Sequence, residues 1–86
     1  MEPRKKFTAE EAKKTGDRLS IKWDKFDIDQ FMRGMNVELE HGLRDPSTNV
    51  SNDDPVITGK IALAHLNEIP DYYDRLEKME EDAGVE

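Results

Sequence analysis

Apolar residues recur at helical spacing in four segments of this chain, and they never alternate with polar residues over a sustained stretch. A period near 3.6 residues favours helices, whereas alternation would favour strands. We therefore predict an all-α fold, a compact bundle of about four short helices with no sheet. The predicted helices span residues 8–19, 27–41, 54–69 and 70–83. A chain of 86 residues has room for one modest core, so residues 1–86 should form a single domain.

Local signals place the starts of these helices. Thr8 and Glu11 have the spacing of a capping box. Asp27 is a suitable N-cap for the second helix, and Asp54 is followed by a proline, which is favoured at a first helical position. These signals predict helices that begin just after Thr8, Asp27 and Asp54.

Other signals place the helix ends. Gly42 is expected to end the second helix in a left-handed conformation, and Pro70 should separate the third helix from the fourth. Residues 1–7 are expected to form an N-terminal arm, and residues 80–86 a frayed acidic tail.

The charge of the chain is uneven. Residues 1–26 carry eight basic and five acidic side chains, a net charge of +3, and residues 27–86 carry five basic and fifteen acidic ones, a net charge of −10. An acidic body repels phosphate, so direct binding of nucleic acid is disfavoured. Without cysteine the chain has no disulfide or thiolate metal site, which fits a cytoplasmic protein. No apolar run approaches the roughly 18 residues of a membrane span, so no membrane partner is expected.

Both histidines of the chain stand three residues from a glutamate. Glu38 and His41 form the first pair, and His65 and Glu68 form the second. This spacing puts the two side chains of a pair on one side of a helix, as in helical bundles that bind divalent metals. One hypothesis is therefore a divalent metal site made of these four residues.

The alternative hypothesis is a hydrogen-bonded clasp. His65 falls among apolar residues on a helical wheel, so we expect a buried ring whose nitrogens need polar partners. The connection between the second and third helices is rich in such groups. The predicted clasp joins the following residues: His65, Thr48, Asn49, Asp53 and Asp54.

Four stretches of the sequence carry a family resemblance: ELEHG at 38–42, TNVSNDDP at 48–55, TGKIALAHLNE at 58–68 and PDYYDRLEKME at 70–80. In these stretches, in residues 8–14 and at Trp23, the chain resembles a family of short, uncharacterised helical proteins found in bacteria and bacteriophages. The resemblance covers nearly the whole chain. It implies a small, self-contained protein and carries over no catalytic residue.

The sequence has no cysteine nucleophile, no Gly-x-Ser-x-Gly turn and no phosphate-binding glycine loop. We therefore predict no enzyme and no cofactor beyond the possible metal ion. In the fourth helix, Tyr72, Leu76 and Met79 share a stripe that should face the core.

The rim of that helix is then the predicted partner surface, through Tyr73, Arg75 and Lys78. The favoured function is that of a non-enzymatic accessory or regulatory protein that contacts another protein. The alternatives are a metal-binding protein and an acidic decoy of nucleic acid.

Overall fold

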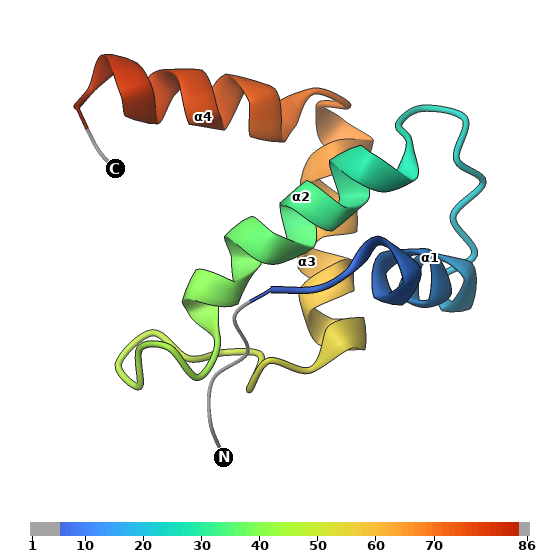
Figure 1. Cartoon of the computed structure of the whole chain (residues 1–86), viewed down its shortest axis with the longest axis horizontal. Helices are drawn as coiled ribbons and strands as arrows, with labels where there is room; N and C mark the ends of the chain where they lie inside the picture. Colours follow the sequence, from blue (N-terminus) through green and yellow to red (C-terminus); the bar gives the residue numbers. More distant parts are fainter. Residues whose placement is uncertain (1–5, 85–86) are drawn as a thin grey trace.

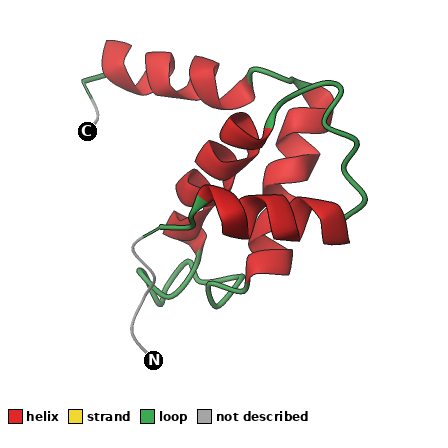
Figure 2. Ribbon diagram, turned by 45° about the vertical axis from the view of Figure 1, so that its right-hand side comes forward, coloured by secondary structure: helices red, strands yellow, loops and turns green. Residues whose placement is uncertain are grey.

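The computed structural model describes residues 6–84, and this part of the chain contains four α-helices and no strand (Figures 1 and 2). The helices are α1 (Ala9–Arg18), α2 (Ile28–Glu38), α3 (Pro55–Glu68) and α4 (Tyr72–Asp82). A short 3₁₀ turn, η1 (Leu39–His41), continues α2. The all-α class and the bundle of four short helices are thereby confirmed.

The three predicted N-caps are present. The Thr8 side chain accepts from the Glu11 N–H, and the Glu11 carboxylate accepts from the Thr8 N–H, which completes the capping box. Asp27 caps α2 through the N–H of residue 30. Asp54 caps α3 by accepting from the Ile57 N–H at 2.8 Å, with a proline in the first turn. Helix starts are set by such local hydrogen bonds, so they can be found in the sequence.

The two ends of the chain differ from the prediction. Phe7 was placed in an N-terminal arm, but its side chain is buried and its N–H donates to the Asn36 side chain of α2. Residues 1–5 lie outside the described part of the chain. The predicted frayed tail is also wrong in part, because α4 stays helical to Asp82. Residues 85–86 are outside the described part.

The end of α2 is another correction. Gly42 has a φ of −109°, which is not left-handed. A glycine is needed there because a Cβ at this position would collide with the carboxylate of Asp53. The left-handed helix stop occurs instead after α1, at Ser20, where φ is 62°. The N–H groups of Ser20 and Ile21 donate back to the carbonyls of Asp17 and Gly16, the bonding of a Schellman motif.

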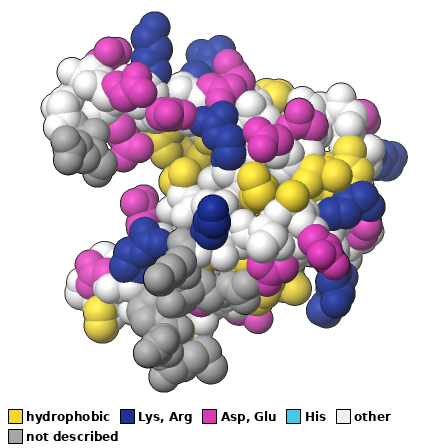
Figure 3. All heavy atoms as spheres, viewed as in Figure 1, with side chains coloured by type: hydrophobic (Ala, Val, Ile, Leu, Met, Phe, Trp, Pro, Cys, Tyr) yellow, Lys and Arg dark blue, Asp and Glu magenta, His cyan; other side chains and the backbone are white. Residues whose placement is uncertain are grey.

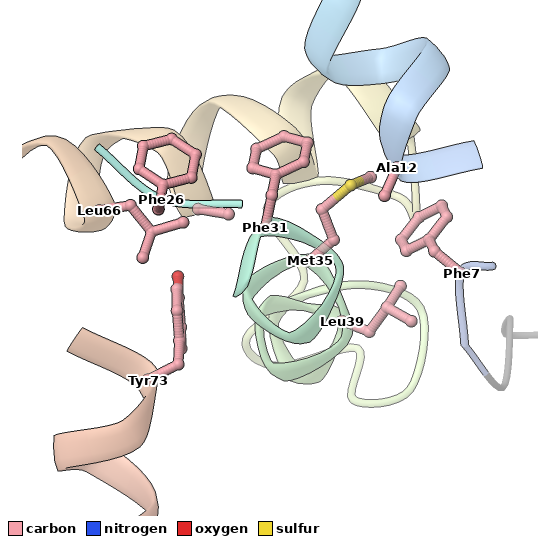
Figure 4. Packing of buried hydrophobic residues seen from close by; sticks show 9 residues of the cluster. Phe7, Ala12, Phe26, Phe31, Met35, Leu39, Leu66 and Tyr73 are labelled. Atoms are coloured by element: carbon pink, nitrogen blue, oxygen red, sulfur yellow. The ribbon is translucent and has the colours of Figure 1, made fainter. Parts of the chain in front are cut away.

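The hydrophobic core is centred on α2, which lies against α1, α3 and α4 (Figure 1). Phe31 and Met35 of α2 are fully buried, with Phe7 on one side and Tyr73 on the other (Figure 4). The other buried apolar residues are Ala12, Phe26, Leu39, Ala62 and Leu66.

Helix α4 projects from the other three helices, and only its first turns contact them (Figure 1). Tyr73 is its one buried side chain, and the ring packs on α2 where Gly34 leaves space. A Cβ on Gly34 would lie 2.5 Å from the tyrosine ring. Arg33 adds ion pairs to Asp74 and Glu77 at the surface. The first half of α4 is therefore fixed to α2, while the second half extends into solvent.

Candidate functional site

The carboxylate of Glu38 lies between the two histidines at the junction of α2, α3 and α4. Nε2 of His41 is 3.9 Å from one carboxylate oxygen, and Nε2 of His65 is 3.6 Å from the other. The Tyr73 hydroxyl donates to the second oxygen at 2.8 Å. Glu38 is 5% exposed, whereas both histidine side chains reach solvent. We refer to Glu38, His41, His65 and Tyr73 as the Glu38 cluster.

Four elements supply the Glu38 cluster. Glu38 is the last residue of α2, and the 3₁₀ turn brings His41 back beside it. His65 comes from the last turns of α3, and Tyr73 is the second residue of α4. The tyrosine is the cluster member that sequence reasoning missed, because its contact with Glu38 spans 35 residues of chain.

The chemistry of the cluster is dominated by the hydrogen bond between Tyr73 and Glu38. Burial of the phenol raises the pKa of Tyr73 far above its usual value of 10, and the neighbouring Glu38 carboxylate raises it further. The hydroxyl is therefore protonated and serves as a donor throughout the physiological pH range. A buried carboxylate needs such a donor, because an unpaired buried charge is costly.

The four proposed metal ligands are not brought together as a set. Glu38, His41 and His65 meet, but Glu68 is exposed at the end of α3 and takes no part. The two imidazoles face different oxygens of one carboxylate. Within residues 6–84, no group of three or more His, Cys, Asp or Glu side chains is arranged to hold a metal ion.

The predicted clasp between His65 and the connection of residues 42–54 is also wrong. The His65 ring stacks on Tyr72, with ring centroids 4.3 Å apart, and meets Tyr73 edge-on. It makes no hydrogen bond to the described connection. His65 lies ten residues into α3, about 15 Å along the axis from the end that the connection enters.

The connection is instead held by its own residues and by η1. The Asp53 carboxylate accepts from the N–H of Leu43 at 2.9 Å, and the carbonyl of His41 accepts from the N–H of Val50 at 2.7 Å. Asn49 bonds to Asn52 within the connection. The other predicted members have local roles, since Thr48 bonds back to residue 45 and Asp54 caps α3.

Of the roles predicted for the two adjacent tyrosines, the rim position of Tyr73 is wrong and the core position of Tyr72 holds in part. Tyr73, expected at the rim, is 1% exposed and cannot anchor a partner. Tyr72, expected in the core, is half-buried: its ring packs against the core and stacks on His65. Arg75 and Lys78 are exposed as predicted, although Arg75 is paired with Asp71 at 2.8 Å.

Comparison with known proteins gives a family match that covers most of the described chain. The model of the DUF5661 family, described as a protein of unknown function, matches residues 12–82. The chain belongs to the DUF5661 family. The matched residues include the complete Glu38 cluster and all of α4. No curated protein and no solved structure matches the chain.

The apolar stripe of α4 that the sequence assigned to the core is only partly covered in the DUF5661 domain: Tyr72 and Leu76 are half-buried against the core, and Met79 is exposed. The apolar side chains of Ile69, Tyr72, Leu76 and Met79 line a shallow hollow, to which Arg75 also contributes, and Met79 is 60% exposed. We refer to these four apolar residues as the α4 face. The signal available in the sequence was their regular spacing, which does not tell whether a stripe meets the core or solvent. Within residues 6–84, no helix has the length and apolar character needed to cross a membrane.

Proposed function

We propose that this DUF5661 protein is a non-enzymatic accessory or regulatory protein that binds another protein through the α4 face. The observation that carries the proposal is the partly exposed apolar hollow on a helix that projects from the bundle, with Met79 60% exposed at this hollow (Figure 1). Exposed apolar side chains that form one continuous patch are typical of interaction sites.

The shape of the α4 face suits a helical partner. Tyr72, Leu76 and Met79 follow the i, i+4, i+7 spacing of one helix face, and they line a hollow of about 180 Å³ with Ile69. The ring of Tyr72 stacks on the ring of His65, which helps to fix its position. A flexible methionine beside a fixed tyrosine is a good surface for the apolar side chains of an amphipathic helix.

The charge around the α4 face favours a basic partner. Residues 71–82 carry six acidic and two basic side chains, and acidic groups gather over α4 in the space-filling view (Figure 3). On the helical wheel Glu80 lies beside one edge of the stripe, and Arg75, which is paired with Asp71, lies beside the other edge with Asp82 just beyond it. The favoured partner is therefore a helix with apolar residues flanked by Lys and Arg. A second copy of this chain would bring two acidic helices together, which is unfavourable.

The α4 face is also held in place before a partner arrives. The buried Tyr73 ring fixes the first turn on Gly34, and Arg33 joins α2 to Asp74 and Glu77. A fixed helix loses less conformational entropy on binding than a mobile one.

The same contacts support a non-enzymatic role, because the Tyr73 hydroxyl and the Glu38 carboxylate are engaged in docking α4. The proposed setting is the cytoplasm of a bacterium or its phage. A chain without cysteine suits a reducing compartment.

A designed peptide provides a defined probe of the α4 face. The peptide is an amphipathic helix with leucines at i, i+4 and i+7 and lysines on both flanks, and its binding is followed by amide chemical shifts. Shifts centred on residues 69–79 are expected for the wild-type protein. Met79→Glu should weaken binding by about tenfold or more, since it adds charge to an apolar contact.

Val50→Glu is the matched control, because Val50 is 71% exposed and lies far from α4 in the connection. It adds the same charge and should leave peptide binding unchanged. Equal binding of a scrambled peptide, or an equal loss in both variants, would refute the proposal. A complex that disappears with modest salt and does not depend on Met79 would favour the acidic decoy. If the protein forms a dimer and Met79→Glu disrupts it, the partner at the α4 face is a second copy of this chain and not a different protein.

A further inference from the structure

A second surface, remote from the α4 face, has the features of a small-molecule site. The connector between α1 and α2 (residues 19–27) and the outer side of α3 enclose a cavity of about 350 Å³. This volume lies within the usual range for ligand pockets. No residue of α4 lines the cavity, so an inference from it is independent of the proposed function.

The floor of the cavity is apolar. Leu19 and Ile21 line it from the connector and Leu63 lines it from α3, all three half-buried. Phe26 is almost fully buried at its base. An alkyl group placed here would cover side chains that the fold leaves partly exposed to water, which is favourable in proportion to the area covered.

The rim of the cavity is basic, in contrast to the acidic body. Lys22 and Lys25 line it, and neither makes an ion pair or hydrogen bond with any residue between 6 and 84. The Asn67 side chain on the facing helix is likewise without a partner in that part of the chain. Asp24 is the one acidic side chain of the rim, so the cavity carries one net positive charge. This balance suits a monoanion better than a dianion.

The connector offers further donors and is held in a fixed shape. Among the described contacts, the N–H groups of residues 22–26 donate to no protein acceptor. Trp23 has a φ of 61°, which is unusual for a bulky residue, and its ring packs on Gly16 while its Nε1–H donates to Asp17. Strained backbone of this kind is found most often at binding sites.

We propose that this cavity binds an amphiphilic monoanion, a medium-chain alkyl carboxylate, with its carboxylate at Lys22 and Lys25 and its alkyl chain over Leu19, Ile21 and Leu63. Both halves of such a ligand find a complementary group: two free ammonium groups for the head and an apolar floor for the chain.

Octanoate is the probe for this proposal. Trp23 is the one tryptophan of the chain, so its fluorescence reports directly on the connector. Titration with octanoate should give a saturable fluorescence change, with amide shifts confined to residues 19–27, 63 and 67. Affinity should fall as salt rises, because two lysines hold the head group. Octylamine has the same alkyl chain and the opposite charge, and it should not bind.

The double variant K22Q/K25Q should lose about tenfold or more in octanoate affinity. Lys60→Gln is the matched control, because Lys60 is exposed on α3 and does not line the cavity. An absence of saturable binding would overturn the proposal. So would equal binding of octylamine, an equal loss of affinity in the control, or shifts centred on the α4 face. Circular dichroism of the variants separates loss of the ligand contact from loss of the fold.

Discussion

The hydroxyl of Tyr73 donates to the buried carboxylate of Glu38 at 2.8 Å, and this bond joins the projecting helix α4 to the end of α2. Glu38 also lies between both histidines, through contacts of 3.6 and 3.9 Å. The most conspicuous polar cluster of the protein therefore serves to place α4. Its consequence is an apolar α4 face that is only partly covered by the core.

Tyr73→Phe should destabilise the protein by about 1–3 kcal/mol, because it leaves a buried carboxylate without its donor. Tyr72→Phe is the matched control. The Tyr72 hydroxyl makes no hydrogen bond with residues 6–84, and its ring can keep its stacking on His65. Urea unfolding monitored by circular dichroism measures both free energies of unfolding. Equal losses in the two variants would show that the Tyr73 bond contributes little.

Gly34→Ala should destabilise the protein by about 1–3 kcal/mol through overpacking, although alanine is the better helix former. The added Cβ would lie 2.5 Å from the Tyr73 ring, so α4 must shift. A smaller side chain at position 73 makes room, and Tyr73→Leu should therefore cost less in the Gly34→Ala background than in the wild type. Thermal unfolding of the four proteins gives the comparison. If the losses of stability from Gly34→Ala and Tyr73→Leu are strictly additive, the strain caused by Gly34→Ala does not arise from the Tyr73 ring.

Stability should fall at alkaline pH in a way that depends on Tyr73. Burial raises the pKa of Tyr73 in the folded protein above the ordinary value of 10, and the Glu38 carboxylate adds to this effect. A raised folded-state pKa means that the contribution to stability is fully present below about pH 10 and is lost as the pH rises above it. Between pH 9 and 11, the free energy of unfolding should therefore fall more steeply with pH for the wild type than for Tyr73→Phe. Identical pH dependence in both would contradict the assignment.

Helix α4 should loosen in acid through Asp74. Hydrogen bonds from Gln30 and Arg33 lower the pKa of Asp74 below its ordinary value of 3.8. A lowered folded-state pKa means that the contribution is present above about pH 4 and is lost as the pH falls through the folded value. Amide hydrogen exchange in α4 should accelerate below pH 4 relative to α3, after correction for the intrinsic rate. Arg33→Gln should weaken this pH dependence, and an unchanged profile would count against the ion pair.

The connection between η1 and α3 should depend on Asp53 rather than on His65. Asp53→Ala removes the acceptor for the Leu43 N–H and is expected to cost about 1–2 kcal/mol. His65→Ala should leave the connection unaltered, since within residues 6–84 the ring meets Glu38 of α2 and stacks with the two tyrosines of α4. Amide shifts of residues 43–53 report the difference. A response of these amides to His65→Ala, and none to Asp53→Ala, would restore the clasp that the sequence suggested.

Features set by neighbours in sequence were predictable, and features set by distant contacts were not. The caps Thr8, Asp27 and Asp54 act over three residues, so each could be placed from the sequence. The deeper burial of Tyr73 relative to Tyr72 could not be foreseen. Adjacent positions on a helix differ by about 100°, and the side that meets the core depends on how the turn after α3 directs α4.

The candidate site shows the same division. The spacing of Glu38 and His41 correctly indicates that they are neighbours, and His65 does join them across 27 residues of sequence. The contact of His65 with α4 instead of the connection was missed. The position of His65 along α3 decides which polar groups its ring can reach, and amino-acid composition does not give that position. The role of Gly42 was missed for a similar reason, since the need for glycine comes from the carboxylate of Asp53, eleven residues later.

A double-mutant cycle between Glu38 and Tyr73 tests the central relationship most directly. Glu38→Gln, Tyr73→Phe and the double variant are compared with the wild type by urea unfolding, with amide shifts of residues 69–79 as a second readout. We predict a coupling energy of at least about 1 kcal/mol and displaced α4 amides in both single variants. Additive losses, with the α4 amides unmoved, would mean that this bond does not hold the helix.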